Sequence, residues 1–301
     1  MVANKSSIDV IIPVYNGKKF IERAISSVLN QTYLPNRILI IDDGSTDGTA
    51  DIIEKIKIDL DQKGGPKIKL LYGNHAGPSA ARNIGIKEIS ADYVAFLDAD
   101  DEWLPNKLEK QINLFINQKD NNLGMVYCKT IVCEYGLDGI IKSEQASDPK
   151  QMLRGDIFEI LLKTNYEIRS PSLFLLPSFV IKNIGLFDEI LKSAEDWDYA
   201  IRIAQKYSID YVDEYLVKMW NEPNSNTKSN WRMLKGFIRL YKKWEQYYSD
   251  EIKNDLADRV GYYLFGLPFI PRMPKHRKSV IGKIRKIVSK PILVDLLSRF
   301  V

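Results

Sequence analysis

Three aspartates follow an apolar run near residue 100 of this chain. The run covers residues 93–97, and the acids are Asp98, Asp100 and Asp101. Neighbouring carboxylates repel one another and are costly to bury unless a cation or hydrogen-bond donors lie among them. On an extended backbone Asp98 and Asp100 point to the same side, and Mg²⁺ prefers carboxylate and phosphate oxygens as ligands. The pattern therefore predicts a metal or phosphate site at the end of a strand.

Asp101 has a second interpretation, as the N-terminal cap of a helix. Aspartate is a preferred capping residue because its carboxylate accepts hydrogen bonds from the first free backbone N–H groups. A helix that begins near Glu102 would use Asp101 in this way. Such a cap accounts for only one acid of the three, so the metal or phosphate site is the stronger hypothesis.

The first hundred residues alternate between short apolar runs and helical patterns. We expect strands over residues 8–14, 37–41, 68–72 and 93–97, and helices over 18–30, 46–57 and 79–89. This alternation predicts a parallel sheet covered by helices, in which ligands bind beyond the carboxyl ends of the strands. Unusual polar sequence follows three of these strands, so we expect residues 13–17, 42–45 and 98–101 to share one rim.

The pattern changes after residue 101. We expect helices over 106–117 and 195–206, strands over 125–133 and 211–217, a hairpin turn at 138–139, a polar loop over 145–155, and apolar segments at 172–176 and 179–184. The sequence beyond residue 217 is mostly helical and aromatic.

Two strand ends carry side chains that could bind a nucleotide. The ring of Tyr15 could stack on a nucleobase, although a strand-end aromatic is more often part of the core. Asp42 and Asp43 precede a glycine turn, which they could cap together with Ser45. Alternatively, Asp43 could accept a hydrogen bond from the imide N–H of a base. The residues alone leave these interpretations open.

The helix expected from residue 79 opens with small residues and carries an arginine. Ser79 could cap this helix. Alternatively, the small side chains let a nucleotide approach, while Arg82 neutralises phosphate or orients the acids. The pattern by itself favours a local structural role for the Arg82 guanidinium.

The helix expected from residue 195 opens with acids. Ser193 with Asp196 fits an acidic form of the capping box, and acids in a first turn suit the helix dipole. Alternatively, Asp196 is a general base that takes a proton from a hydroxyl group. The chain has only two histidines, His75 and His276, so a carboxylate is the natural candidate for a base and a Ser-His-Asp triad is poorly supplied.

These segments together resemble the family 2 glycosyltransferases, which have the GT-A fold and invert the anomeric centre. The resemblance rests on five motifs in the family's order: Ile-Ile-Pro-Val-Tyr-Asn at 11–16, Asp-Asp-Gly-Ser-Thr-Asp at 42–47, Gly-Pro-Ser-Ala-Ala-Arg-Asn at 77–83, Asp-Ala-Asp-Asp at 98–101 and Glu-Asp-Trp-Asp at 195–198. Each motif is a soft pattern, but the set of five, which covers roughly residues 6 to 220, is very specific.

The resemblance implies the residues of a donor site. The residues expected around the donor nucleotide are Pro13, Tyr15, Asp43, Arg82 and Asp98. Tyr15 would flank the base, Asp43 would contact it, and Asp98 would lie near the ribose.

The resemblance also implies how the chemistry is divided. Asp100 would hold Mg²⁺ or Mn²⁺ on the diphosphate, and Asp196 would be the catalytic base. Glu195 and Trp197 would contact the acceptor or support the start of the helix. The Gln-x-x-Arg-Trp motif of the processive synthases is missing, which favours transfer of a single sugar over polymer synthesis.

We therefore expect an α/β protein with the GT-A fold, in which a Rossmann-like and mostly parallel sheet is flanked by helices. Residues 1–220 would form the glycosyltransferase domain, with a nucleotide-binding half at 1–101 and an acceptor half at 102–220, followed by a helical extension at 221–271 and a basic amphipathic tail at 272–301. The expected reaction moves one sugar from a nucleotide-sugar, of which UDP is the commonest carrier, to a glycan or lipid-linked hydroxyl group.

Two other functions fit the acids less well. A nucleotidyltransferase that makes sugar nucleotides would also use acids and metal, but it needs a glycine- and basic-rich loop near its amino end, and residues 13–19 are a poor version of one. A non-catalytic subunit that binds nucleotide-sugars would not need both Asp100 and Asp196.

Cysteine content and charge restrict the setting. Cys128 and Cys133 are the only cysteines and do not form a CxxC pair, so we expect reduced thiols and a cytosolic protein. The residues from 272 onward have a net charge of +8, which leaves −4 for the first 271. The body is therefore not a typical nucleic-acid binder, whereas the tail suits an anionic surface on the inner face of the cell membrane.

The tail generates a prediction. Ile281, Ile284 and Val288 share one face of a helical pattern among basic residues, as in helices that lie on anionic lipid; packing on the protein body is the other interpretation. We expect protein truncated before Arg272 to lose sedimentation with anionic vesicles. Unchanged sedimentation of the truncated protein would exclude the membrane role.

Overall fold

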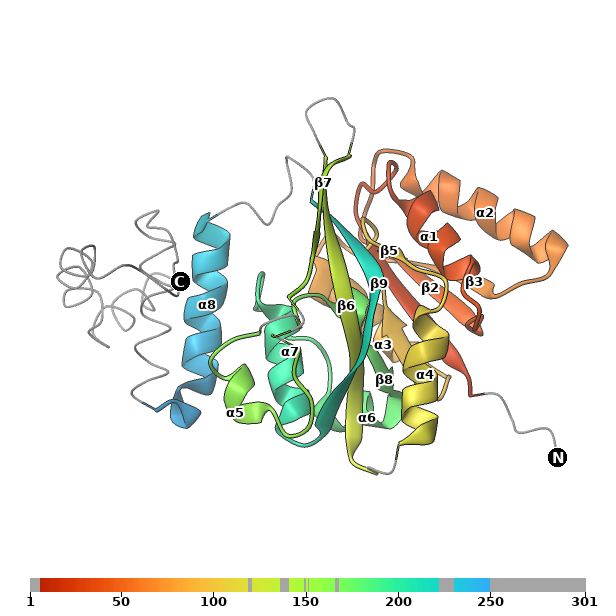
Figure 1. Ribbon diagram of the computed structural model, residues 1–301. Coiled ribbons are helices and arrows are strands. Elements are labelled where there is room, and N and C mark those ends of the chain that lie inside the picture. Colours follow the sequence, from red (N-terminus) through yellow and green to blue (C-terminus); the bar gives the residue numbers. More distant parts are fainter. Residues whose placement is uncertain are drawn as a thin grey trace.

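A computed structural model of the chain describes residues 6–118, 121–135, 141–148, 150, 152–165, 168–221 and 230–249. These residues form helices that flank one nine-stranded sheet, in which the strand order is β3-β2-β1-β4-β8-β6-β9-β5 and β7 pairs with β6 (Figure 1). The strands are β1 Ile8–Val14, β2 Arg37–Asp42, β3 Lys67–Tyr72, β4 Tyr93–Phe96, β5 Glu102–Trp103, β6 Leu123–Tyr135, β7 Ile141–Ala146, β8 Leu175–Pro177 and β9 Ser208–Asn221. The helices are α1 Ile21–Leu29, α2 Thr49–Lys63, α3 Pro78–Lys87, α4 Lys107–Asn117, α5 Phe158–Leu161, α6 Ser178–Ile184, α7 Glu195–Ala204 and α8 Asn230–Trp244, with 3-10 turns η2 at Pro171–Leu173 and η4 at Glu245–Tyr247.

The amino-terminal half of the sheet is parallel. Strand β1 pairs with β2 and with β4, and β2 pairs with β3, all in the parallel sense. Every residue of β1 is buried, which agrees with its unbroken apolar, β-branched sequence and with a sheet covered on both faces. Because Val14 lies opposite Asp42, and Ile11 opposite Phe96, the three polar strand ends lie at the same rim.

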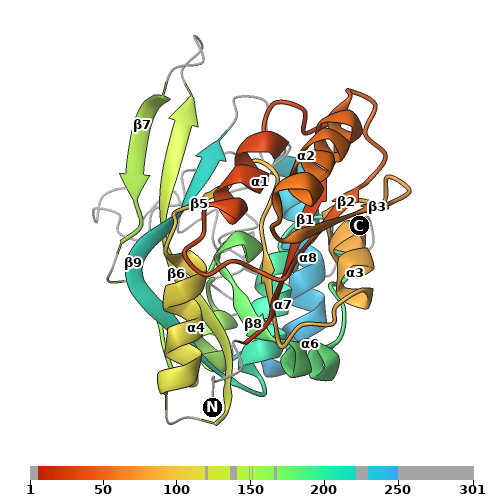
Figure 2. The same ribbon diagram turned by 90° about the vertical axis from the view of Figure 1, so that its right-hand side faces the viewer.

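The second half of the sheet is mixed. Strand β8 is antiparallel to both β4 and β6, whereas β6 and β9 are parallel to each other. Strand β7 is antiparallel to β6 and lies beside it at an outer edge of the sheet (Figure 2). The α/β class and the sheet flanked by helices are thus confirmed, with parallel pairing among β1 to β4 and again between β6 and β9.

The helix expected over residues 106–117 is confirmed as α4. The alternative in which a helix begins near Glu102 is wrong, because Glu102 and Trp103 form strand β5, paired with β9. The polar loop expected over residues 145–155 is partly wrong, because β7 continues to Ala146. At Glu102 pairing with the distant strand β9 determined the backbone, and at Ala146 pairing with the preceding strand β6 did so; local propensity reports neither pairing.

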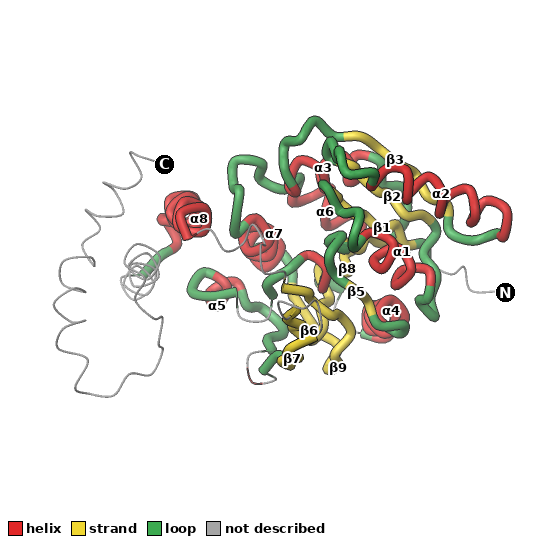
Figure 3. The backbone as a smooth tube through the Cα atoms, turned by 90° about the horizontal axis from the view of Figure 1, so that it is seen from above, coloured by secondary structure: helices red, strands yellow, loops and turns green. Residues whose placement is uncertain are grey.

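Helix α8 lies beside α7, at the opposite end of the molecule from α2 (Figure 3). It falls within the stretch 221–271 that was expected to be helical, whereas the turn at 138–139 and the tail at 272–301 lie outside the described residues. Among the described residues, no helix has both the length and the apolar character needed to cross a bilayer. Cys128 and Cys133 are both free and buried in the structure.

Close packing of α3 on the sheet depends on Gly85. A Cβ atom at this position would lie 2.8 Å from Ile11 Cγ2 and 2.9 Å from Ile41 Cδ1, on strands β1 and β2. Because these strands carry the rim, the glycine fixes the distance between α3 and the polar strand ends.

We expect Gly85→Val to destabilise the protein by about 1–3 kcal/mol through overpacking. Chemical denaturation measures this change, with Lys87→Val, at an exposed position of the same helix, as the control for a β-branched residue in this helix. Equal unfolding free energies for the two variants would contradict the close contact.

Candidate functional site

The loops after β1 and β2 lock together at the rim. The backbone N–H of Asn16 donates to Ser45 Oγ at 2.8 Å, and the N–H of Thr46 donates to Asn16 Oδ1 at 2.9 Å. Asn16 has a φ of 50°, in the left-handed region that asparagine tolerates better than most residues. The two loops therefore form one rigid edge of the site.

Asp42 serves the turn after β2. Its Oδ1 accepts from the backbone N–H of Ser45 at 2.7 Å, so the interpretation as turn chemistry is confirmed for Asp42. Asp43, in contrast, turns toward the loop before α3. Its two carboxylate oxygens accept from the backbone N–H groups of Ala76 and Gly77, at 3.1 Å and 2.7 Å.

An aromatic pair joins the loop after β1 to the loop before α3. The ring of Tyr15, which is 46% exposed, has its centroid 4.2 Å from that of His75. His75 has a φ of 56°, so its backbone holds a conformation that is uncommon outside glycine. The sequence did not single out His75 as a site residue. Its place directly before the small residues of α3 was the available signal.

Burial separates the three members of the acid cluster. Asp98 and Asp100 are partly buried, whereas Asp101 is 4% exposed. Asp101 does not cap a helix, so that interpretation is wrong: its Oδ2 accepts from Ser172 Oγ at 2.6 Å. The backbone N–H of Asp98 donates to the same Ser172 oxygen at 2.9 Å. Residue 172 of η2 thus ties both ends of the cluster together.

Asp100 is held through its backbone by helix α1. Arg23 of α1 donates to the backbone carbonyl of Asp100 at 2.6 Å. Desolvation and the nearby charge of Asp98 raise the pKa of Asp100 to about 6. Burial raises the pKa of Asp101 well above its ordinary value, and Asp100 and Asp98 add to that effect.

The cluster fits a cation that also takes phosphate oxygens. Within the described part of the chain, no group of three or more metal-binding side chains is close enough to hold an ion without other ligands. Mg²⁺ is commonly bound by one or two carboxylates plus substrate phosphates, so a full protein cage is not required. Asp98 already accepts from Arg82, which leaves Asp100 as the better protein ligand.

Arg82 joins two motifs that are far apart in the sequence. Its NH2 group lies 2.6 Å from Asp98 Oδ1, and its NH1 group lies 3.2 Å from Glu195 Oε1. The Arg82 side chain is only 4% exposed. Burial by itself lowers the pKa of Arg82, but the two carboxylates outweigh this effect and hold the pKa above its ordinary value. These contacts fit the interpretation in which Arg82 orients the acids, and they join two predicted site residues.

The start of α7 is not a capping box. Its N-cap is Ala194, and Ser193 Oγ instead donates to the backbone carbonyl of Arg232 in α8 at 3.0 Å. Ala194 has a φ of 61°, an uncommon conformation for a residue with a Cβ atom. This strained residue directly precedes Glu195 and Asp196, so it sets the direction in which α7 begins.

Asp196 is the acid of this turn with the most perturbed pKa. Its Oδ1 accepts from the backbone N–H of Trp197 at 2.7 Å. Desolvation and the neighbouring charge of Glu195 raise the pKa of Asp196 to about 8. A carboxyl group with a pKa near the working pH is suited to accept a proton.

The remaining predicted residues lie below the surface. Pro13 is buried in β1, and Trp197 is 1% exposed, with its Nε1 donating to the carbonyl of Leu161 at 2.6 Å. Trp197 therefore anchors α7 to α5. Ser79 does not cap α3, which has Gly77 as its N-cap; the Ser79 Oγ is buried without a hydrogen-bond partner among the described residues.

Comparison with known sequences agrees with this arrangement. The model of the Glycosyl transferase family 2 matches residues 9–185. An uncharacterized glycosyltransferase of Rickettsia typhi is 34% identical over 213 residues, which cover 70% of this chain and 63% of that protein. TuaG of Bacillus subtilis, a glycosyltransferase provisionally assigned to teichuronic acid biosynthesis, is 39% identical over 116 residues, 38% of this chain and 44% of TuaG.

Solved structures share the fold. Residues 1–349 of TarS from S. aureus, in complex with UDP-GlcNAc, superpose with a TM-score of 0.62 at 20% identity, covering 97% of this chain and 83% of that one. The mannosyltransferase PcManGT from Pyrobaculum calidifontis, in complex with GDP-Man and Mn²⁺, gives 0.62 at 14% identity, covering 98% and 84%. These likenesses identify the GT-A arrangement of sheet and helices.

The aligned residues cover less than two thirds of the Rickettsia typhi protein, so this chain matches only part of that relative's length. The family model covers more than half of the chain, and its matched range contains four of the five motifs gathered at the rim. By this match and by its fold, the chain belongs to glycosyl transferase family 2.

Proposed function

We propose that this protein transfers one sugar from a nucleotide-sugar, in the first place a UDP-sugar, to a hydroxyl group of a glycan or lipid-linked acceptor, with inversion at the anomeric carbon. One observation carries the proposal. Arg82 brings Asp98, from the acid cluster, and Glu195, from the start of α7, to opposite sides of a single guanidinium. A donor-binding motif and a candidate base are thereby held at one rim, as a transfer reaction requires.

The donor would lie across this rim. Tyr15 and His75 offer ring faces for a base, and Asp43 has lone pairs for the imide of uracil beyond the two that accept from Ala76 and Gly77. Asp98 would contact the ribose. The complex of TarS with UDP-GlcNAc supports a UDP-sugar as the first choice.

The reaction needs a leaving group and a base. A bond forms between the acceptor oxygen and the anomeric carbon, while the bond to the diphosphate oxygen breaks and its electron pair leaves with the diphosphate. Asp196 accepts the proton of the acceptor hydroxyl group. Because attack and departure take place on opposite faces of the sugar, a single displacement inverts the configuration.

A divalent cation fits at Asp100. The Mn²⁺ in the PcManGT complex supports a metal in this fold, and Mg²⁺ or Mn²⁺ would suit a carboxylate that shares its ion with a diphosphate. When bound, the cation supplies Lewis-acid stabilisation of the charge on the leaving group. Glu195, held by Arg82, would keep the base and the donor at a fixed separation.

The acceptor class is supported by a relative. TuaG is assigned to teichuronic acid biosynthesis, so a growing surface polysaccharide is the acceptor class that we propose. The basic tail, outside the described residues, would bring the enzyme to the inner face of the membrane, where a lipid-linked acceptor is presented. The family match gives no support to the nucleotidyltransferase that was considered as an alternative from the sequence.

Asp196→Asn tests the base. The variant keeps its size but cannot take up the proton, so we expect transfer to fall by roughly 10²–10⁴-fold with donor binding nearly unchanged. Asp51→Asn is the matched control, since Asp51 is an exposed acid in the first turn of α2. Product formation from radiolabelled donor, with donor binding by calorimetry, gives both readouts.

The pH dependence of the transfer rate, compared between the parent enzyme and Asp196→Asn, is a second test of the base. The base form of Asp196 is lost as the pH falls below its pKa of about 8. The transfer rate of the parent enzyme should therefore rise from pH 6 to 8, and the residual rate of Asp196→Asn should lack this rise. Parent-like transfer by the variant, or a parent rate that is flat over this range, would contradict the assignment.

A thermal-shift series tests the donor. Bound ligand raises stability by mass action, by about 2.7 kcal/mol at a hundred times Kd. We expect UDP-sugars with Mn²⁺ to raise the Tm, and Tyr15→Ala to reduce the shift. Tyr247→Ala is the control, at 40% exposure beside 46% for Tyr15. Stabilisation by GDP-sugars but not by UDP-sugars would contradict uracil as the nucleobase of the donor and indicate guanine instead.

A further inference from the structure

The segment 188–198 leads into the first turn of α7 and carries Asp196. It contains the strained backbone of Ala194, with a φ of 61°. An uncommon backbone conformation persists only where the surroundings hold it in place. The contacts of this segment therefore decide where the proposed base lies.

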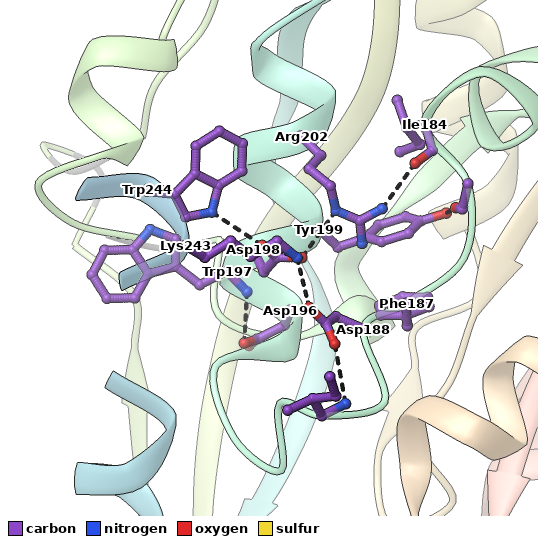
Figure 4. A network of polar contacts seen from close by, with 12 residues as sticks. Ile184, Phe187, Asp188, Asp196, Trp197, Asp198, Tyr199, Arg202, Lys243 and Trp244 are labelled. Carbon is purple, nitrogen blue, oxygen red and sulfur yellow. Dashed lines mark hydrogen bonds and ion pairs between the residues drawn. The ribbon is translucent and has the colours of Figure 1, made fainter. Parts of the chain in front are cut away.

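A single side chain of α8 contacts both ends of the segment. The ammonium group of Lys243 lies 2.7 Å from Asp188 Oδ2 and 2.9 Å from Asp198 Oδ1 (Figure 4). The residues between these two aspartates include the strained turn and the base. Lys243 thus closes the segment into a loop by a bridge between two carboxylates.

Asp198 is the more demanding end of this bridge. It is fully buried, and its carboxylate also accepts from Arg202 Nε at 2.9 Å and from Trp244 Nε1 at 3.0 Å. A buried carboxylate is costly unless charged and hydrogen-bonded partners satisfy it. Two of these partners, Lys243 and Trp244, come from α8, so the charge of Asp198 draws α8 onto α7.

Further contacts from α8 run along the middle of the segment. Arg239 donates to the backbone carbonyl of Ile190 at 2.7 Å, and Arg232 donates to that of Lys192 at 2.8 Å. Gly236 allows the approach, since a Cβ atom there would lie 2.0 Å from Ser193 Oγ. The helix therefore follows the segment closely over its whole length.

We propose that α8 is part of the catalytic site and that Lys243 is a positioning residue, which sets the place of Asp196 by joining Asp188 to Asp198. This inference rests on the proposed function, in which Asp196 is the base. A displacement of about 1 Å at a reacting group can lower a rate by roughly a hundredfold. The bridge therefore acts on the rate of the chemical step and leaves the nucleotide-binding rim, on β1 and β2, unaffected.

Packing without positioning is the alternative. Trp197 meets Phe237 with 5.8 Å between ring centroids, and Phe158 meets Trp244 at 6.1 Å. If these apolar contacts alone hold α8, removal of the Lys243 charge leaves the segment in place. The two interpretations differ in what a lysine substitution does to the backbone of residues 189–196.

Lys243→Met and Lys242→Met form a matched pair for this test. The side chains of Lys243 and Lys242 are 33% and 34% exposed. Lys243 pairs with Asp188, whereas the ammonium group of Lys242 lies 3.8 Å from the carboxylate of Glu245, three residues further along the chain. Hydrogen exchange of the full-length protein measures opening of residues 189–196 without any substrate. We expect exchange there to be about tenfold faster in Lys243→Met and unchanged in Lys242→Met. Equal exchange in both variants would overturn the proposal.

Turnover separates positioning from binding. With UDP-GlcNAc as the probe, we expect Lys243→Met to lower kcat for donor hydrolysis by about ten- to a hundredfold with KM unchanged. Lys243→Arg, which keeps the charge, should restore most of the rate. Trp244→Phe keeps an aromatic side chain but removes one donor to Asp198, and should give a smaller loss of the same kind. A raised KM with unchanged kcat would overturn the proposal.

The exchange and turnover experiments distinguish failure of the proposed function from failure of the positioning role. A parent enzyme that turns over no nucleotide-sugar would count against the proposed function, while the exchange experiment would still decide whether Lys243 closes the segment. Conversely, a fully active parent enzyme with unaltered exchange in Lys243→Met would leave the proposed function standing and remove the positioning role.

Discussion

The buried guanidinium of Arg82 is the interaction on which the geometry of the site depends. It separates two carboxylates, Asp98 and Glu195, that would otherwise face each other in surroundings of low polarity and repel. Glu195 follows Arg82 by 113 residues, so this one cation fixes the distance between the strand end at β4 and the start of α7. Close packing of α3 at Gly85 in turn fixes where the guanidinium lies.

The site nevertheless holds more acids than Arg82 can balance. The pKa values of Asp100 and Asp196 are raised, to about 6 and about 8, because burial and neighbouring carboxylates disfavour their charged forms. A cation on a diphosphate would offset the repulsion around Asp100. Asp196, in the role that we propose, would accept the proton of the acceptor hydroxyl group. The same excess of negative charge that costs stability thus provides the two chemical roles that we propose.

Helix α8 extends this network beyond the residues that the family model matches. Asp198 places a buried charge in the first turn of α7, and this carboxylate is paired with Lys243 and Trp244 of α8. The backbone carbonyl groups of Ile190 and Lys192, before α7, accept hydrogen bonds from arginines of α8. The first turn of α7 is therefore held both by Arg82, through Glu195, and by α8, through Asp198.

The sequence by itself determined the alternation of strands and helices, the shared rim and the identity of the acids, because apolar periodicity and motif spacing are local properties. It could not decide which acid does what. Asp101, Ser79 and Ser193 all fit capping patterns, yet none of them caps a helix. Asp101 accepts from Ser172 of η2, Ser193 donates to Arg232 of α8, and Ser79 lies inside α3, whose N-cap is Gly77. Partners from distant elements exist only in the tertiary structure, and desolvation, which separates the pKa values of these acids, arises only when the elements pack.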